Sequence, residues 1–200
     1  MSHGLRRGLV VAALALAARP VDAGAAEHTR NGVCAGVGFG IESVSWTQEG
    51  DRRPAEGSGT LTARVGFAVK PDLVLGVEFW GWSQDHELST PTLPVPVNVK
   101  LTATNACASF FPGNTGVFLR FGLGLAYGRV KQEPPPSVTN VPAVTESRTG
   151  VAFNFSPGYE WRVAPRLALG AQGDIVYLGL GDVLKNAFGY GLSAQFNWYW

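Results

Sequence analysis

The chain has 200 residues, a length that suits one domain or one small barrel with an export signal. Charged residues make up 16% of it, against about 25% in an ordinary soluble domain, while glycine is frequent at 26 residues and aromatic residues reach 11%. The net charge of +1 gives no reason to expect a nucleic-acid partner. No run approaches the roughly 18 consecutive apolar residues of a transmembrane helix, so a membrane-spanning part has to be built from strands.

The first part of the chain has the features of an export signal. Two arginines and a short apolar core (residues 6–18) precede an Ala-x-Ala cleavage site at 23–25. We therefore expect 1–25 to be a cleaved signal peptide and 26–200 to be the mature domain. Cleavage removes three of the 16 basic and one of the 15 acidic residues, which leaves a net charge of −1.

Eight segments that alternate large apolar with small or polar residues follow the signal, and this period of two indicates β-strands. In chain order they cover 33–46, 58–70, 73–83, 97–111, 115–131, 147–161, 166–178 and 188–200. The fifth segment is the clearest, with Phe121, Leu123 and Leu125 on one face and glycines between them. In the fourth segment we expect the apolar residues of its first half to face outward and a bulge in its second half, 105–111. The outward residues expected there are Val97, Val99, Leu101 and Ala103.

Alternation alone does not say which face points inward. A soluble, lipocalin-like barrel would hide its apolar face in the lumen and expose the other face to water. The second face of these strands, however, is mostly Gly, Ala, Ser, Thr, Asn and Gln, with too few charges for a solvated exterior. We therefore predict an all-β fold: an eight-stranded antiparallel up-and-down transmembrane β-barrel, whose apolar face meets lipid and whose glycine-lined face encloses a narrow polar lumen.

The connections between segments alternate between short and long. Short turns are predicted at Pro71-Asp72, at 112–114 and at 163–165, where proline, glycine and asparagine gather. The other connections are longer: 47–57, 84–96, 132–146 and 179–187. Outer-membrane barrels have this asymmetry, with short periplasmic turns and longer external loops. We expect a monomer with both termini in the periplasm.

The pattern resembles a known family, the small eight-stranded outer-membrane barrels of the OmpA-transmembrane-domain and OmpX-like type. Residues 120–128, Arg-Phe-Gly-Leu-Gly-Leu-Ala-Tyr-Gly, resemble the glycine-rich fifth strand of that family. The terminal Phe196-x-Trp198-x-Trp200 resembles the C-terminal signal that the barrel-assembly machinery recognises. The likeness extends over nearly the whole mature chain, and it implies a cell outer-membrane location, with outer-membrane lipid and the assembly machinery as partners.

Several ionisable residues fall on the inward face of different strands. Arg64, Glu78 and Arg120 are predicted at similar heights, together with Gln172 and Gln195, and Glu42 and Asp174 somewhat higher. Unpaired buried ions cost several kcal/mol each, so we expect these side chains to pair and to close the lumen. The alternative is a gate, in which Glu78 exchanges partners between the two arginines and opens a narrow ion path.

Catalytic, metal and redox chemistry are not indicated. Small barrels of this kind include lipid A-modifying enzymes, which need a base such as histidine beside a serine nucleophile. The mature chain offers His28 near its start and His86 in the second long connection, near Ser89, with no positioned oxyanion donor. No Cys/His set has metal-ligand spacing, and no cofactor is expected.

Two other residue types lead to further expectations. Cys34 and Cys107 fall on the first and fourth strands, too far apart in a barrel for a disulfide. The six tryptophans lie near predicted strand ends and indicate an interfacial belt, with two at the outer rim, Trp80 and Trp82, that are also candidates for a ligand contact. The six are Trp46, Trp80, Trp82, Trp161, Trp198 and Trp200.

These observations rank three functions. The first is a structural or surface-interaction barrel with a closed polar lumen and exposed loops, through which an extracellular partner would bind. The second is a narrow channel or a conduit for a small hydrophobic ligand. The third is a lipid-modifying enzyme, and we expect the chain not to be one.

Overall fold

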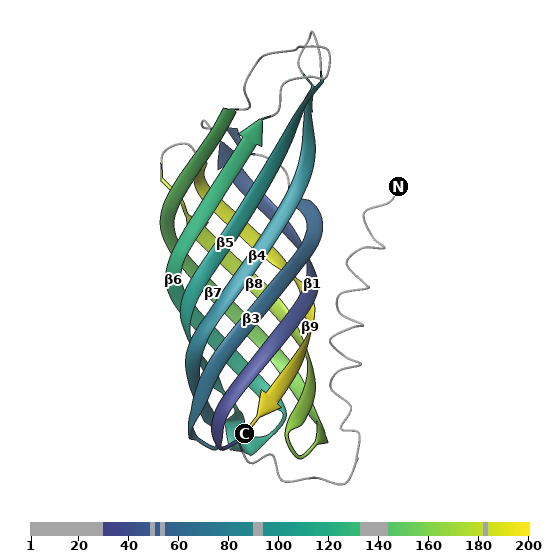
Figure 1. The fold of residues 1–200 in the computed structure, drawn as a ribbon, viewed down its shortest axis with the longest axis vertical. Helices are drawn as coiled ribbons and strands as arrows, with labels where there is room; N and C mark the ends of the chain where they lie inside the picture. Colours follow the sequence, from purple (N-terminus) through teal and green to yellow (C-terminus); the bar gives the residue numbers. More distant parts are fainter. Residues whose placement is uncertain (1–29, 49–50, 53–54, 90–93, 133–143, 182–183) are drawn as a thin grey trace.

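Long antiparallel strands make up nearly all of the described chain (Figure 1). The computed structural model describes residues 30–48, 51–52, 55–89, 94–132, 144–181 and 184–200. Its elements are β1 (Gly32–Gln48), β2 (Asp51–Arg52), β3 (Glu56–Lys70), β4 (Leu73–Ser89), β5 (Pro94–Phe110), the 3₁₀ turn η1 (Pro112–Asn114), β6 (Val117–Gln132), β7 (Val144–Ala164), β8 (Leu167–Gly179) and β9 (Leu184–Tyr199). No described helix is long and apolar enough to cross a membrane.

The strands close into a ring. Each of the eight long strands pairs with its neighbour in chain order, and β9 pairs with β1 through a ladder from Cys34–Tyr199 to Trp46–Ala187. The two-residue β2 only extends the sheet at one end of β1. Closure leaves no long strand with an unpaired edge, which hydrocarbon requires because it offers backbone groups no hydrogen-bond partner. The predicted eight-stranded up-and-down barrel is therefore confirmed.

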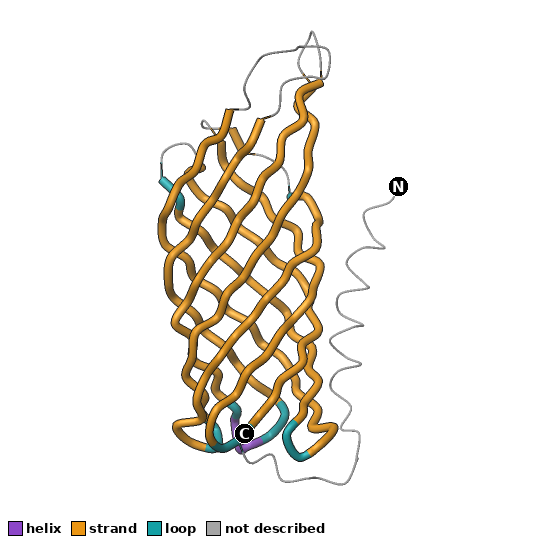
Figure 2. Tube along the Cα trace, viewed as in Figure 1, coloured by secondary structure: helices purple, strands orange, loops and turns teal. Residues whose placement is uncertain are grey.

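The two ends of the barrel differ, as Figure 2 shows. At one end, the turn end, β3–β4, β5–β6 and β7–β8 are joined by the tight connections 71–72, 111–116 and 165–166. In the middle turn Gly113 and Asn114 both have positive φ (62° and 54°), the conformation that glycine and asparagine accept most readily. The opposite end, the loop end, contains the other ends of the long strands, from which the chain passes from β1 to β3, β4 to β5, β6 to β7 and β8 to β9.

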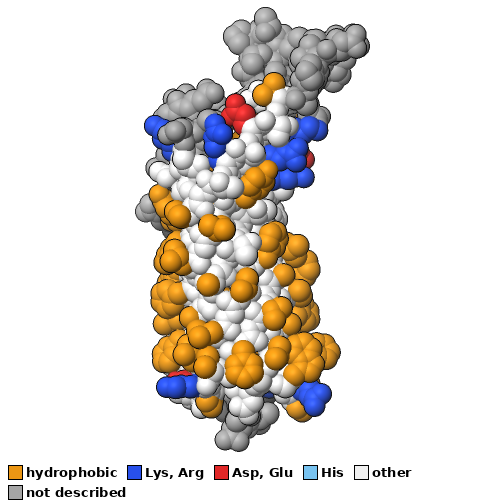
Figure 3. Space-filling view, turned by 60° about the vertical axis from the view of Figure 1, so that its left-hand side comes forward, with side chains coloured by type: hydrophobic (Ala, Val, Ile, Leu, Met, Phe, Trp, Pro, Cys, Tyr) orange, Lys and Arg blue, Asp and Glu red, His pale blue; other side chains and the backbone are white. Residues whose placement is uncertain are grey.

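Apolar side chains cover the outside of the barrel wall (Figure 3). Ile41, Leu123 and Leu125 are 74%, 67% and 73% exposed, values that suit contact with lipid rather than water. Phe67, Phe121 and Phe153 also point outward, so the soluble barrel with an apolar interior is excluded. The predicted outward face is confirmed for every segment except the fourth.

The fourth predicted segment has the opposite orientation to the one expected. Along β5 the residues at 97, 99, 101 and 103 are buried inside the barrel, and the alternate positions, among them Thr104 and Phe110, face outward. Pairing with β4 and β6 runs without a shift from Val97 to Phe110, so the expected bulge is absent. The register decides the orientation, because Asn105 pairs with the inward-facing Glu78. An inward face need not be polar, and here part of it is apolar.

The hairpins also extend further than expected at the loop end. Strands β4 and β5 remain paired as far as Ser89 and Pro94, so most of the expected loop 84–96 is a regular ladder. This hairpin extends furthest at the loop end in Figure 1. The expected signal peptide, 1–25, lies outside the described residues, as do 133–143 of the third long connection.

Replacing Leu123 by arginine tests the outward face. Leu123 lies near the middle of β6, so Leu123→Arg is expected to lower the free energy of unfolding by about 2–4 kcal/mol in a bilayer. Ser147→Arg, at an exposed outward position near the loop end, is the control and is expected to cost about 0–1 kcal/mol. Urea unfolding in lipid vesicles measures both. Equal destabilisation would contradict the assignment of the membrane-facing wall.

Candidate functional site

A network of charged and amide side chains crosses the middle of the lumen, and Arg120 on β6 is its centre. Its guanidinium is buried and donates to Glu78 Oε2 at 3.2 Å, to Gln172 Oε1 at 2.8 Å and to Ser109 Oγ at 2.9 Å. A longer bond of 3.4 Å reaches Gln195. Arg120 thus joins strands β4, β5, β6, β8 and β9 across the barrel interior.

Arg64 on β3 completes this network from the other side. Its Nη1 lies 3.9 Å from Glu78 Oε2, the same oxygen that Arg120 contacts, and its other donors reach the amide oxygens of Gln195 and Asn197. Arg64 and Glu78 are direct cross-strand partners in the β3–β4 ladder. Two guanidinium groups therefore share one carboxylate, and neighbouring amide oxygens accept further hydrogen bonds from both.

The two other acids of the predicted cluster bind neutral donors. Asp174 accepts hydrogen bonds from Ser156 (2.6 Å), Gln172 (2.6 Å) and Ser193 (2.5 Å). Glu42, which is fully buried, accepts a bifurcated bond from the indole Nε1 of Trp80 at 3.0 and 3.2 Å. No ion pair among the described residues joins either acid to Arg64 or Arg120. The structure thus brings together three of the five predicted charges and separates the other two.

Two glycines allow this network to form. Gly191 pairs with Glu42 on one side and Asp174 on the other, and a Cβ at Gly191 would lie 2.4 Å from Glu42 Cγ. At Gly122 a Cβ would lie 1.8 Å from Asn154 Oδ1. A side chain at either position would displace the neighbouring acid or amide. The glycine-rich inward face therefore makes room for long polar side chains.

The turn end contains an ion pair that the sequence analysis missed. Arg30 and Glu160 are both almost completely buried and lie 3.2 Å apart. Tyr199 Oη (2.7 Å) and Asn197 Nδ2 (2.6 Å) also donate to Glu160, and Arg30 stacks over the ring of Phe111 at 3.5 Å. Glu160 lies on the inward face of the sixth predicted strand, so the alternation of that strand indicates a buried carboxylate. Arg30 precedes the first predicted strand and had no periodic signal.

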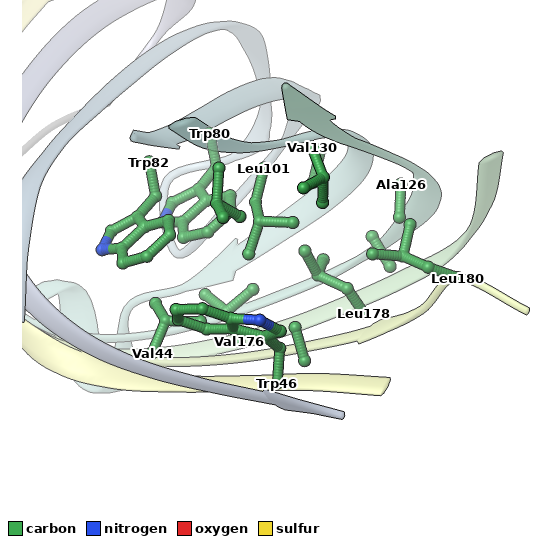
Figure 4. Packing of buried hydrophobic residues seen from close by; sticks show 14 of the residues in the cluster. Val44, Trp46, Trp80, Trp82, Leu101, Ala126, Val130, Val176, Leu178 and Leu180 are labelled. Atoms are coloured by element: carbon green, nitrogen blue, oxygen red, sulfur yellow. The ribbon is translucent and has the colours of Figure 1, made fainter. Parts of the chain in front are cut away.

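The loop-end half of the lumen is apolar, not polar as expected. Side chains from seven of the eight long strands point into it and pack together (Figure 4). The cluster comprises Val44, Trp46, Trp80, Trp82, Val97, Val99, Leu101, Ala103, Ala126, Val130, Ala152, Val176, Leu178, Leu180 and Ala187. We call it the tryptophan layer. It lies directly above the charge network, because Trp80 and Trp82 follow Glu78 by two and four residues along β4.

The prediction of an interfacial belt is therefore wrong for three of the six tryptophans. Trp46, Trp80 and Trp82 are only 2–3% exposed, and the rings of Trp46 and Trp82 meet edge to face at 5.9 Å. Trp198 and Trp200 (50% and 57% exposed) have the outward position of a belt, and so does the half-buried Trp161, which pairs with the outward-facing Leu169. Trp80 follows the inward-facing Glu78 by two residues, so the alternation of the strand by itself indicates an inward orientation. A ligand contact at Trp80 or Trp82 would require opening the tryptophan layer.

The remaining candidate residues form no chemical centre among the described residues. Cys34 and Cys107 are free, buried thiols. They line a cavity of about 20 Å³ beside Arg64 and Arg120, which has room for about one water molecule. His86 lies in β4 with its backbone paired to Val97, and its side chain is outside the description, as is the whole of His28.

A closed ring of long strands with a lipid-facing apolar wall and a filled interior defines a small transmembrane β-barrel protein. Residues 9–196 match the sequence model of the outer membrane protein beta-barrel domain. The chain belongs to this family, and its location is the outer membrane. No curated protein matches the sequence.

Solved structures share the fold at low sequence identity. One is Ail, the attachment invasion locus protein of Yersinia pestis, in complex with the heparin analogue sucrose octasulfate: 18% identity, 84% of this chain and 99% of that chain covered, TM-score 0.58. Another is Neisserial surface protein A (NspA), with 14% identity, 83% and 97% coverage and a TM-score of 0.51. At these identities the likeness concerns the fold alone.

Removing Glu78 tests the charge network. Glu78→Ala leaves Arg120 buried without its carboxylate and is expected to lower the free energy of unfolding by about 3–5 kcal/mol. Asp85→Ala is the control, because Asp85 is an exposed acid on the same strand, and its loss is expected to cost less than about 1 kcal/mol. The two variants are compared by chemical unfolding. Similar values would show that the network does not stabilise the barrel.

Fluorescence quenching tests the position of the tryptophans. A phospholipid with brominated acyl chains quenches indoles that face the lipid. Replacing Trp161, Trp198 and Trp200 together by phenylalanine is expected to remove most of the quenchable emission, because all three lie on the outward face. Replacing Trp46 and Trp82 in the same way is expected to remove almost none of it. The reverse result would restore the belt interpretation.

Proposed function

We propose that the protein is a closed-lumen outer-membrane barrel with a structural or surface-interaction role, which it performs through the strands and loops of its loop end. The observation that carries the proposal is the filling of the lumen by two successive layers. An ion would have to cross the Arg64–Glu78–Arg120 network and then the tryptophan layer, which offers it almost no polar contact. Each layer opposes conduction for a different reason.

The energetics of the two layers support closure. Separating Glu78 from both arginines in a buried site would leave uncompensated charges, each costing several kcal/mol. In the layer above, Val99, Leu101 and Leu178 are no more than 1% exposed, so water has no room between them. An eight-stranded barrel has an interior that side chains can fill, and this sequence fills it.

The loop end is the proposed functional end, and it faces the cell exterior in this proposal. The β4–β5 hairpin supports this, because its ladder continues to Ser89 and Pro94, well beyond the outward apolar residues of the wall. Strands held in a continuous ladder lose little conformational entropy on binding, which favours contact with an extracellular partner.

Export and assembly complete the proposal. In it residues 1–25 are removed, and the outward aromatic row of Phe196, Trp198 and Trp200, each at least 50% exposed, is the segment read by the barrel-assembly machinery. The mature domain is a monomer surrounded by outer-membrane lipid. We also infer a non-enzymatic role, since the described buried acids are bound by arginine, amide, hydroxyl or indole donors.

A narrow channel is the second candidate, and one contact favours it. Glu78 Oε2 lies within 4 Å of both Arg64 and Arg120, so a small movement would exchange its partner. The cavity of about 20 Å³ beside both arginines provides room for that movement. A path would also require the tryptophan layer to open.

Planar-bilayer recording separates the two candidates. The unmodified protein is expected to give no resolved single-channel current, and Trp80→Ala with Trp82→Ala is expected to remain closed because the charge network persists. Adding Glu78→Ala and Arg120→Ala to these two changes truncates side chains in both layers and is expected to produce current. Heat-modifiable gel mobility checks that each variant is folded. Current from the unmodified protein would favour the channel.

Labelling of whole cells tests the orientation. In a background with both native cysteines replaced by serine, Thr145→Cys, at an exposed position near the loop-end limit of β7, is expected to react with a membrane-impermeant maleimide. Pro165→Cys in the turn end is expected to react only after the outer membrane is permeabilised. The opposite pattern would refute the proposed surface role.

A further inference from the structure

The outer wall carries a row of polar side chains at one level near the loop end. Ser83, Lys100, Arg129 and Ser147 are successive cross-strand partners on β4, β5, β6 and β7. All four are exposed and lie on the outward face of their strands. We call them the outer row. Two cations thus lie side by side, with a hydroxyl on each flank, and Figure 3 shows basic side chains at this end of the wall.

The outer row lies at the limit of the membrane-facing surface. Along β6 the outward positions run Leu123, Leu125, Tyr127 and then Arg129. Two residues of a strand advance by about 6.7 Å, so Arg129 lies one such step beyond the aromatic ring that marks the interface. Lipid headgroups occupy this depth. The side chains project sideways from the wall, toward lipid rather than toward the opening of the barrel.

The two cations have no anionic partner in the described protein. Like charges directly opposite each other in a sheet are destabilising, yet Lys100 and Arg129 are such a pair, and no ion pair of either is found among the described residues. The nearest acid along β4, Asp85, lies one outward position further on, and its carboxylate accepts a hydrogen bond from Asn98 at 2.7 Å. An external anion would therefore remove the repulsion.

The cations are also specific to this part of the wall. The first outward position beyond the apolar residues is Ser43 on β1, Thr149 on β7 and Gly179 on β8. None of these is basic, so a general preference for cations at the interface does not explain Lys100 and Arg129.

We propose that the outer row binds the phosphate group of an outer-leaflet lipid headgroup. Lys100 supplies a compact ammonium and Arg129 a planar guanidinium fork, and both donate charge-assisted hydrogen bonds to phosphate oxygens. The hydroxyls of Ser83 and Ser147 flank them as further donors. This inference rests on the proposed function in one respect: the orientation of the barrel decides which leaflet the outer row faces. The arrangement of the four side chains on the wall is the same in either orientation.

Binding of lipid A in detergent tests the site. Lipid A is a lipid with two phosphate groups, and native mass spectrometry counts the copies retained on the folded, full-length protein. Lys100→Gln with Arg129→Gln is expected to lower the apparent affinity at least tenfold. The matched control is Lys70→Gln with Arg166→Gln, which removes two exposed cations at the turn end and is expected to change it less than twofold. Gel mobility verifies that both double variants are folded.

Further probes identify what the row recognises. Removing both phosphates from lipid A is expected to weaken its binding to the unmodified protein by a similar factor and to have little effect on the Lys100/Arg129 variant. Equal binding of lipid A to the outer-row variant and the control would overturn the proposal. So would sucrose octasulfate binding that depends on these cations while lipid A binding does not, since the row would then be a site for soluble polyanions.

The readouts separate this site from the proposed function. Lipid A binding measured in detergent does not depend on the orientation of the barrel in the membrane or on conduction. A protein that conducts current, or that is labelled at the turn end on whole cells, would refute the proposed function, and phosphate-dependent binding through Lys100 and Arg129 would still support the site. Loss of that binding in a closed, correctly oriented barrel would refute the site alone.

Discussion

The structure depends on one constraint: backbone amides and carbonyls inside hydrocarbon must find partners within the protein. The β1–β9 ladder meets this constraint by closing the sheet, and closure divides every strand into one face toward lipid and one toward a narrow interior. Since the lipid face needs no packing partner, all protein–protein packing has to take place in the lumen. The side chains in the lumen therefore stabilise the barrel as a hydrophobic core stabilises a soluble domain.

The lumen is filled by layers of different chemistry. At the turn end the Arg30–Glu160 pair is covered by aromatic rings, in the middle Arg120 and Arg64 share Glu78, and toward the loop end the tryptophan layer excludes water. Ionic layers specify geometry through hydrogen bonds, but they are costly when incomplete. An apolar layer tolerates small movements. Trp80 connects the two kinds of layer, because its ring lies in the tryptophan layer while its Nε1 binds Glu42.

The outside of the barrel shows a similar division. Most of the wall is apolar and meets acyl chains, whereas Lys100 and Arg129 lie where the apolar surface ends. Their repulsion is a local cost within a ladder that is otherwise well matched. In a filled barrel the outer wall and the loop end are the surfaces left for recognition. In the proposed function the lumen stabilises the barrel, and partners bind on the exterior.

The sequence by itself determined the strand number, the tight turns and seven of the eight outward faces, because an alternation of two residues follows directly from strand geometry. It also indicated that Arg64, Glu78 and Arg120 share a height, since residue counts from the turns set heights along a strand. It could not determine how Val97 and Leu101 are oriented, because both faces of β5 contain apolar residues. Nor could it determine that Trp46 and Trp82 meet, because they lie on different strands that are not neighbours in the sheet. Only the tertiary structure decided these points: the register with β4 turns those residues inward, and closure brings side chains from distant strands into one small volume.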